Sequence, residues 1–340
     1  MNEQSISTVI KEQAPLILAE IKKANSVLLH CHPSPDPDSV GSALAMKFAL
    51  EQLGKKVTVI KGDSEIPQAF MHFPGASEIV RKNFFEVDLK DFDLFIVLDS
   101  ARIEMVSRRG EVKFPPTLKT VAIDHHQSNG MFCSVNMVVT SYPANCLILY
   151  DLFQEWGVKL TPEISANLFI GIYADTGGFK YHGVTADTYG VACSLVSMIP
   201  DVSKLITSME NSNSPKYLAF EGAALDRIEV SESSKFAMSI VPISVLKEKN
   251  IPIIDVKTSE VSSFLLTVTD WLIVVSGVEI EPEKIKFSFR SKDGEKYDVA
   301  KLTGTMGGGG HKAAAGLILS MPLDEAKKKV AEKVKELYNL

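Results

Sequence analysis

Residues 30–42 of the chain read HCHPSPDPDSVGS, and this stretch separates two segments of regular structure. The apolar residues 26–30 before it predict a strand, and residues 40–53, which end at Gly54, predict a helix. A loop that follows a strand and opens a helix lies at the carboxyl edge of a sheet, where open α/β folds bind ligands. Its three prolines stiffen the backbone. The stretch therefore indicates an α/β fold with a binding site at this edge.

The first 200 residues continue this alternation of strands and helices. Further strands are predicted at 56–61, 93–98 and 120–123, and further helices at 5–24, 144–156, 162–174 and 185–198. Residues 94–98 are wholly apolar, as is typical of buried parallel strands. The expected fold class is α/β, with a doubly wound, mostly parallel sheet.

A second domain follows a turn-rich break at residues 211–215, which read NSNSP. We expect a catalytic domain at 1–200, a linker at 201–215 and a smaller α/β domain at 216–340. The second domain is predicted to contain a helix at 216–228, strands at 235–241, 271–278 and 284–291, and a Lys-rich terminal helix.

Composition limits the partners of the protein. The chain has 340 residues, with 36 Lys and Arg against 42 Asp and Glu, so its formal net charge is −6. An acidic balance argues against a grip on long duplex nucleic acid. Its apolar runs are far shorter than the roughly 20 residues of a membrane helix, and the N-terminus has no secretory h-region. We expect a cytoplasmic protein with no membrane partner.

Acidic and imidazole side chains end four of the predicted elements. They are His32, Asp36 and Asp38 in the opening stretch, Asp99 after one strand, Asp124, His125 and His126 after another, and Asp175 after an apolar helix. Each alone has a bland explanation, since Asp38 could be a helix N-cap and an Asp after a strand is often a turn former. Carboxylates gathered at one point repel one another unless cations lie between them. The set therefore predicts a site for divalent cations.

The order of these motifs resembles the DHH phosphoesterase family. Asp124-His125-His126 is similar to the triplet that names the family, and the motifs around residues 32–42, Asp99 and 175–177 resemble its other motifs. Residues 289–291 and 308–316 resemble the DHH-associated domain of the nucleotide-acting branch. In size, the chain resembles stand-alone members that combine oligoribonuclease activity with phosphatase activity on adenosine 3',5'-bisphosphate (pAp).

The resemblance implies a role for each matched residue. His32, Asp36 and Asp99 would bind one Mn²⁺, and Asp38, Asp99, His125 and Asp175 the other, with Mg²⁺ or Co²⁺ as substitutes. His126 would face the scissile phosphate and Asp124 would orient a neighbouring histidine. The active site would lie in a cleft between the domains, with the second domain binding the nucleotide. The substrate-binding candidates there are Arg290, Ser291, Gly308, Gly309, Gly310 and His311.

The leading functional hypothesis is a Mn²⁺-dependent phosphoesterase that degrades short RNA oligonucleotides and dephosphorylates pAp by two-metal activation of water. A phosphodiesterase for cyclic or linear dinucleotides is the nearest alternative. A pyrophosphatase or polyphosphatase, a RecJ-type exonuclease and a non-catalytic nucleotide-binding protein follow. Residues 143–147, PANCL, depart from the family pattern, which leaves contacts to the base and leaving group open. The sequence also leaves the oligomeric state open, including a homodimer.

Overall fold

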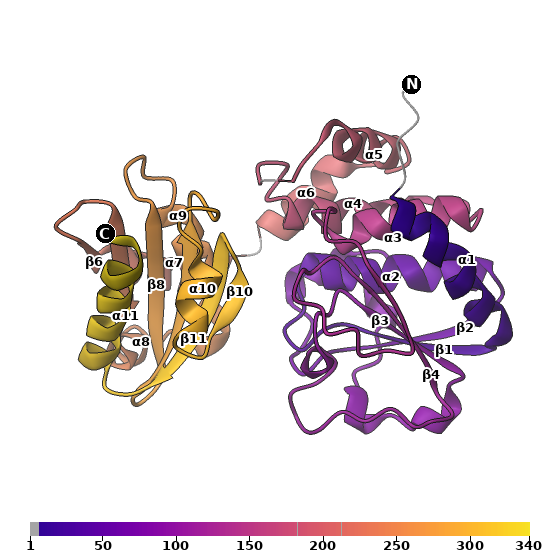
Figure 1. Cartoon of the computed structure of the whole chain (residues 1–340), viewed down its shortest axis with the longest axis horizontal. Helices are drawn as coiled ribbons and strands as arrows, with labels where there is room; N and C mark the ends of the chain where they lie inside the picture. The colour runs from indigo at the N-terminus through magenta and orange to yellow at the C-terminus, as the bar shows by residue number, and fades with distance from the viewer. Residues whose placement is uncertain (1–6, 182, 212) are drawn as a thin grey trace. The chain divides into compact units, whose positions relative to one another are not determined.

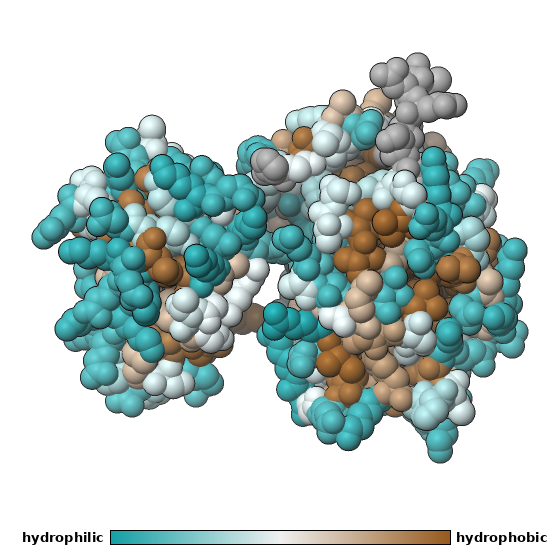
Figure 2. All heavy atoms as spheres, viewed as in Figure 1, coloured by the Kyte–Doolittle hydropathy of each residue, from teal (hydrophilic) through white to brown (hydrophobic). Residues whose placement is uncertain are grey.

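The computed structural model describes residues 7–181, 183–211 and 213–340. The chain divides into two compact units, Met1–Ser212 and Asn213–Leu340, each with a sheet and its own helices (Figure 1). The surface in view is mainly hydrophilic, with apolar patches on the first unit (Figure 2). Among the described helices, none is long and apolar enough to cross a membrane.

The first unit is built on a five-stranded sheet whose neighbouring strands all run parallel, in the order β2-β1-β3-β4-β5. The strand order reverses between β1 and β3, because β2 flanks one side of β1 and the later strands extend from the other. Ligand sites of open α/β sheets lie at this reversal, outside the carboxyl ends of the strands. The strands are β1 (Ser26–His30), β2 (Lys56–Ile60), β3 (Leu94–Leu98), β4 (Lys119–Asp124) and β5 (Val135–Val138).

Six helices of the first unit share one core with one face of this sheet. The opposite face packs beneath short 3-10 segments and loops, through a second cluster that includes Phe84 and Phe95. The fold is therefore the α/β class that the sequence predicts, with α-helices gathered on one face. The helices are α1 (Thr8–Lys23), α2 (Pro37–Gln52), α3 (Asn145–Glu155), α4 (Pro162–Asp175), α5 (Ala186–Val196) and α6 (Val202–Glu210). Residues 5 and 6 of the first predicted helix lie outside the described residues.

Two glycines let α2, α3 and α4 approach one another closely. A Cβ atom on Gly41 of α2 would lie 2.5 Å from the backbone oxygen of Asn167 on α4. A Cβ atom on Gly171 of α4 would lie 2.4 Å from Cys146 Sγ on α3 and 2.6 Å from Asp38 Oδ1 on α2. The close approach places Asp38 beside both other helices.

The structure differs from the expected linker at 201–215. Helix α6 fills residues 202–210 and buries Leu205 in the core of the first unit. Ser214 then caps α7 (Pro215–Leu225), and its hydroxyl accepts a hydrogen bond from Tyr217 N. The amphipathic spacing of Leu205, Ile206 and Met209 explains why this segment packs instead of forming a free linker.

The second unit contains a six-stranded sheet in the order β10-β11-β9-β8-β7-β6. Only β7 and β8 pair in parallel among these strands. Helices α10 and α11 share a core with one face, and α7, α8 and α9 with the other. The further elements are β6 (Ile228–Val230), β7 (Phe236–Val241), α8 (Ile243–Glu248), α9 (Thr258–Leu265), β8 (Ile273–Glu281), β9 (Lys284–Ser291), α10 (Val299–Gly304), β10 (Gly309–His311), β11 (Ala314–Ser320) and α11 (Leu323–Tyr338).

The close helix packing yields a stability prediction. Gly171→Ala should lower the free energy of unfolding by about 1–3 kcal/mol, because the added methyl group overpacks the contact with Cys146 and Asp38. Gly222→Ala on α7 is the control, since a Cβ there meets nothing within 4 Å and alanine favours a helix by up to about 1 kcal/mol. Urea denaturation of both variants measures the difference. Equal effects would contradict the packing argument.

Candidate metal centre

The loop after β1 is held by hydrogen bonds to the first turn of α2. Asp36 is the N-cap of this helix, and its Oδ1 accepts a hydrogen bond from Ser39 N at 2.9 Å. Its Oδ2 lies 3.1 Å from His32 Nε2, and His32 N donates to Ser39 Oγ at 2.9 Å. Asp36 therefore occupies the capping position that the sequence alone could assign to Asp38, which leaves the Asp38 carboxylate for other contacts.

Asp38 is fully buried in the first turn of α2 and caps a different helix. Its Oδ2 accepts from Asn145 N at 2.6 Å, and its Oδ1 accepts from Cys146 N at 3.0 Å. Both N–H groups belong to the first turn of α3, whose N-cap residue Ala144 makes no side-chain cap. The segment that departs from the family pattern thus contributes backbone donors to a predicted metal ligand.

Asp99 occupies the middle of the centre. It follows β3 in the left-handed conformation, with φ +50°, which Asp and Asn tolerate better than most residues. Only 3% of it is exposed. Its Oδ1 lies 3.4 Å from His125 Nε2 and 3.6 Å from His126 Nδ1, and its Oδ2 lies 3.9 Å from His32 Nε2. The left-handed turn directs this carboxylate toward three histidines.

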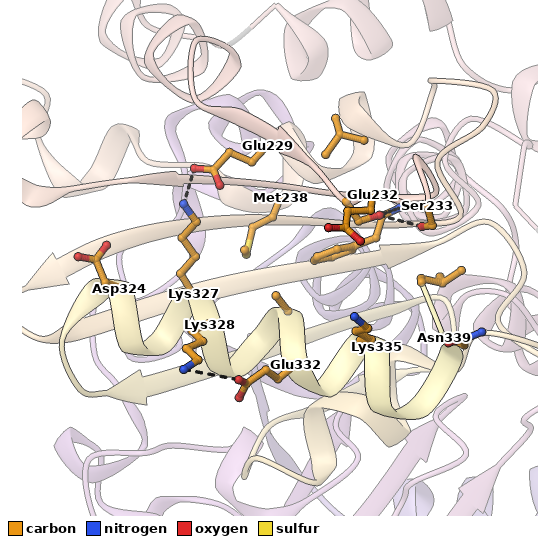
Figure 3. A pocket seen from close by; sticks show the side chains of 15 residues that line it. Glu229, Glu232, Ser233, Met238, Asp324, Lys327, Lys328, Glu332, Lys335 and Asn339 are labelled. Atoms are coloured by element: carbon orange, nitrogen blue, oxygen red, sulfur yellow. Dashed lines mark hydrogen bonds and ion pairs between the residues drawn. The ribbon is translucent and has the colours of Figure 1, made fainter.

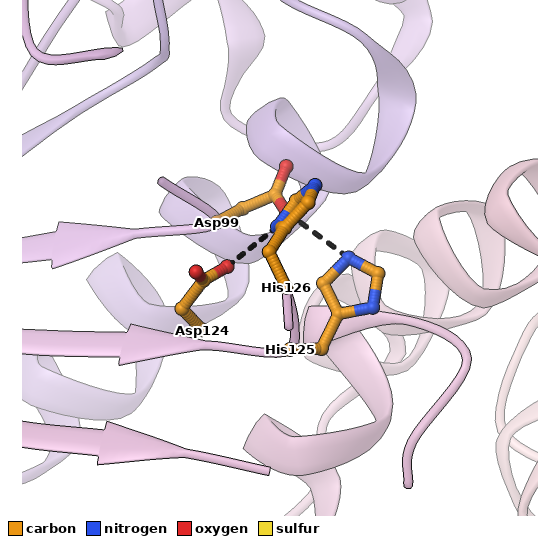
Figure 4. A group of neighbouring side chains, drawn as sticks. All are labelled: Asp99, Asp124, His125 and His126. Atoms are coloured by element: carbon orange, nitrogen blue, oxygen red, sulfur yellow. Dashed lines mark hydrogen bonds and ion pairs between the residues drawn. The ribbon is translucent and has the colours of Figure 1, made fainter. Parts of the chain in front are cut away.

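The triplet at the end of β4 gives each residue a separate contact (Figure 4). Asp124 Oδ1 lies 2.7 Å from His126 Nδ1, and Asp124 Oδ2 accepts from Asn129 Nδ2 at 2.7 Å. Asn129 Nδ2 also donates to Ser100 O at 3.2 Å, which ties the loops after β3 and β4 together. Sequence reasoning missed Asn129, because an Asn five positions after an Asp carries no signal of its own.

His125 points a single nitrogen at the carboxylates. Its Nδ1 lies 3.3 Å from the carbonyl oxygen of Tyr142, which can only accept a hydrogen bond. Nδ1 therefore carries a proton, and Nε2 faces Asp99 Oδ1 and Asp175 Oδ2, each 3.4 Å away. This tautomer suits a metal ligand.

The structure brings all six predicted metal ligands together in two sets. The ligand atoms of His32, Asp36 and Asp99 lie within 4.8 Å of one another, and so do those of Asp38, His125 and Asp175. Asp99 also contacts the second set, because its Oδ1 lies 3.4 Å from His125 Nε2. A third set of the same kind joins Asp99, Asp124, His125 and His126.

Burial makes this concentration of acid groups costly. It raises the pKa of Asp99 and Asp175 well above the ordinary value, and the charges of Asp38 and Asp36 raise both further. Burial also raises the pKa of Asp38. Burial would raise the pKa of Asp36 as well, but the charge and hydrogen bond of His32 lower it to about 2. Divalent cations would allow all four groups to ionise together.

In the Asp124–His126 pair, the pKa shifts favour the charged forms of both side chains. Burial alone would lower the pKa of His126, but its hydrogen bond to Asp124 and the charge of Asp99 raise it. Burial would raise the pKa of Asp124, yet the hydrogen bond and charge of His126 lower it. The pair therefore favours an imidazolium beside a carboxylate.

The donor set of the centre fits divalent cations. It combines imidazole nitrogens with carboxylate oxygens, which suit Mn²⁺, Mg²⁺ and Co²⁺. Asp99 Oδ1 is buried and has no hydrogen-bond partner among the described residues. An acceptor left this way is expensive unless a cation or donor satisfies it.

The predicted substrate residues of the second unit fall on different faces of its sheet. Ala314 pairs with Arg290 on one side and with His311 on the other, so all three side chains share a face. Arg290 Nε donates to Ser263 Oγ of α9 at 3.2 Å. Ser291 belongs to the opposite face, is buried, and its hydroxyl accepts from Asp293 N at 3.3 Å.

The glycine run at residues 307–310 leads into the edge strand β10, which packs closely against β11. A Cβ on Gly308 would lie 2.4 Å from Gly316 O, and one on Gly310 would lie 2.5 Å from Ala314 O. Gly308 N donates to Thr303 O at 2.9 Å, so this N–H is already used. Gly309 and Gly310 pair with Gly316 and Ala315 of β11. Gly308 and Gly310 are therefore needed for close strand packing beside His311, whereas a Cβ on Gly309 would meet nothing within 4 Å.

A cavity of about 620 Å³ lies on the second unit, and none of the predicted site residues lines it (Figure 3). It is bounded by the β6–β7 hairpin and α11. Its charges largely balance, since Lys327 pairs with Glu229, and Lys328 lies 3.8 Å from Glu332. The acid and histidine cluster of the first unit, which carries reactive groups, is the stronger functional candidate.

The sequence pattern of the DHH family, N-terminal domain, matches residues 26–172. This range holds all five strands of the first unit and five of the six predicted metal ligands. Residues 26–172 therefore form a DHH-family N-terminal domain.

Its relatives include proteins named bifunctional oligoribonuclease and PAP phosphatase NrnA. The chain is 27% identical to that of Thermus thermophilus over 323 residues, which cover 94% of this chain and 93% of that protein. It is 24% identical to that of Bacillus subtilis over 328 residues, which cover 93% and 96%. It is thus an NrnA-like protein.

Solved structures share the fold. An exopolyphosphatase-related protein from Bacteroides fragilis superposes with a TM-score of 0.87 at 21% identity, over 97% of each chain. A RecJ structure in complex with Mn²⁺ from Thermus thermophilus superposes with a TM-score of 0.54 at 15% identity, over 98% of this chain and 55% of that one.

Asp99→Asn tests the cation site through stability. Asn accepts the left-handed backbone and removes one buried charge, so without metal the variant should be at least as stable as the wild type. With Mn²⁺ at 100 times its dissociation constant, the wild type should gain about 2.7 kcal/mol, and the variant less than half of that. Thermal unfolding with chelator and with Mn²⁺ measures both values.

Asp63→Asn is the matched control. Asp63 is a partly buried carboxylate of the same unit that accepts from Ser107 Oγ and Arg108 N outside the cluster. This variant should keep the full gain from Mn²⁺. An equal gain in Asp99→Asn would count against Asp99 as a ligand.

Proposed function

We propose that the protein is a phosphoester hydrolase that uses two divalent cations, Mn²⁺ foremost, to cleave short oligoribonucleotides to nucleoside monophosphates and to dephosphorylate pAp. The observation that carries the proposal is the convergence of six imidazole and carboxylate ligands in two sets linked through Asp99 and His125. Two such cations supply an activated water and a positive field for the charge that builds on the phosphoryl oxygens. His32, Asp36 and Asp99 would hold one cation, and Asp38, Asp99, His125 and Asp175 the other.

His126 is the residue of this centre best suited to contact the phosphate. The Asp124 carboxylate accepts a hydrogen bond from Nδ1–H and favours the imidazolium form. In that form Nε2–H would donate to a phosphoryl oxygen, whose charge increases in the transition state. Asn129 holds Asp124 in place, so it positions His126 indirectly.

The second unit offers a separate cationic surface for another phosphate. Arg290 and His311 share a sheet face, on either side of the small residue Ala314. A guanidinium binds a phosphate through a fork of N–H donors. A substrate with two phosphorylated positions, such as pAp or a short oligonucleotide, matches a protein with two phosphate-binding places.

The relatives support this choice of substrate. The two NrnA proteins that each match more than nine-tenths of this chain, over 94% and 93% of its length, are named oligoribonuclease and PAP phosphatase. The formal charge of −6 argues against a long duplex substrate. The favoured substrates are therefore short and single-stranded.

A substrate panel tests the activity. With Mn²⁺, the wild type should hydrolyse pAp and di- to pentaribonucleotides, and Asp99→Asn should lower kcat by at least about 100-fold, because it removes the ligand that connects the two sets. Asp63→Asn should keep wild-type kcat. A wild type inert on these substrates but active on cyclic dinucleotides, pyrophosphate or long single strands would replace the proposal with that alternative.

The role of the second unit is tested by Arg290→Ala. Loss of a charged hydrogen bond to phosphate should raise KM for pAp by about 10- to 100-fold, with a smaller change in kcat. Arg290→Lys should recover only part of the loss, since an ammonium lacks the planar fork. Lys286→Ala, which removes an exposed cation from the same strand, is the control and should leave KM unchanged. An equal rise in both variants would indicate general electrostatic attraction.

A further inference from the structure

The segment that follows Asp175 forms a rigid turn. Thr176 is buried, and its hydroxyl donates to Ile172 O at 2.6 Å and accepts from Phe179 N at 3.0 Å. Its carbonyl oxygen accepts from both Lys180 N and Tyr181 N at 2.9 Å. The backbone from Asp175 to Tyr181 is therefore fixed by four hydrogen bonds to one residue.

Aromatic side chains of α4 and α5 pack against the same turn. Phe179 stacks on Tyr189 of α5, with ring centroids 5.3 Å apart, and lies edge-on to Tyr173 of α4 at 6.0 Å. Phe179 is held in the left-handed region, with φ +63°. Its ring thus packs against the helices and fixes where the next residues emerge.

Tyr181 lies on this turn with one ring face covered and the side chain 54% exposed. A Cβ atom on Gly177 would lie 2.5–2.7 Å from three atoms of the Tyr181 ring, at nearly equal distances. Such distances place the Gly177 backbone against the face of the ring. The ring therefore packs on Gly177, where only a residue without a side chain fits, while 54% of Tyr181 remains exposed.

An exposed aromatic face beside a phosphate-cleaving centre suits one kind of ligand. Asp175, two positions before Gly177, lies 3.4 Å from His125 in the second ligand set. Nucleobases stack on aromatic side chains irrespective of sequence, because every base has a π-face. Burying one face of an aromatic ring on a glycine preorganises the other, since the side chain loses little further freedom on binding.

We propose that Tyr181, seated on Gly177, is a stacking platform for the nucleobase of the nucleotide whose phosphate is cleaved at the metal centre. This inference rests on the proposed function and adds a base-binding subsite to it. The platform favours nucleotides over base-free phosphoesters and tolerates all four bases. It also gives the first unit a contact with substrate that requires no metal.

Steady-state kinetics of the full-length protein tests the platform. Tyr181→Ala should raise KM for pAp and for diribonucleotides by about 5- to 150-fold, the range for loss of one stacked base, and Tyr181→Phe should stay near wild type. A base-free bisphosphate with a tetrahydrofuran sugar should show equal KM in the wild type and Tyr181→Ala. Phe85→Ala, which removes a ring 46% exposed elsewhere in the unit, should change neither substrate.

A second pair of variants disturbs the seat without removing the ring. Gly177→Ala places a methyl group where the ring lies, so it should raise KM for nucleotides as Tyr181→Ala does. Gly157→Ala is matched to it, because Gly157 also has a positive φ, +67°, but a Cβ there meets nothing within 4 Å. Gly157→Ala should lose stability from backbone strain and keep its KM.

The results separate this proposal from the proposed function. If the wild type turns over nucleotides and Tyr181→Ala changes KM for the nucleotide and base-free substrates equally, or changes neither, the platform is wrong and the hydrolase stands. If the wild type hydrolyses no nucleotide, base stacking is tested directly by the fluorescence of a bound dinucleotide that contains 2-aminopurine. Quenching by the wild type that is lost in Tyr181→Ala supports the platform, and equal quenching in both overturns it.

Discussion

The mutual repulsion of four carboxylates gathered at one centre, two of them buried, is the constraint on which the first unit depends. Asp36, Asp38, Asp99 and Asp175 converge where burial raises the pKa of the last three. The protein offsets part of this cost with backbone N–H groups to Asp38 and with an imidazole beside Asp36. Divalent cations bound at the centre would offset the remaining cost, because they neutralise the charge of the carboxylates. The same carboxylates thus destabilise the metal-free fold and are the predicted ligands of the cations.

Topology explains how residues far apart in the chain share this centre. The loops after β1 and β3 leave adjacent strands at the point where the strand order reverses, so His32 and Asp99 meet there. Asp175 arrives at the end of α4, which packs closely on α2 because Gly41 and Gly171 have no side chains. The rigid turn that follows Asp175 then displays Tyr181. The end of α4 and the turn after it therefore carry both the predicted metal ligand Asp175 and the proposed base-stacking residue Tyr181.

Much of the site could be predicted from sequence, because its motifs are short and each follows a strand or helix with a clear pattern. All six metal ligands predicted in this way lie in the two clustered sets. Contacts between distant segments could not be predicted. The cap of α3 by Asp38, the Asn129 contact to the Ser100 carbonyl and the Tyr142 carbonyl at His125 all join segments whose distance depends on packing. Ser291 likewise shares a strand with Arg290, but strand alternation places it on the opposite face.

By itself, the sequence determined the alternation of strands and helices, the family motifs and the identity of the acid and imidazole groups, since these depend on local pattern and residue chemistry. Only the tertiary structure decided which carboxylate caps which helix, which nitrogen of His125 faces the centre and which ring face of Tyr181 is open. It also turned the expected linker into α6 and the glycine run into an edge strand. The physical reason is that hydrogen bonding and burial are set by neighbours in space, and those neighbours can lie more than 100 positions away in the chain, as Asp38 and Cys146 do at a separation of 108.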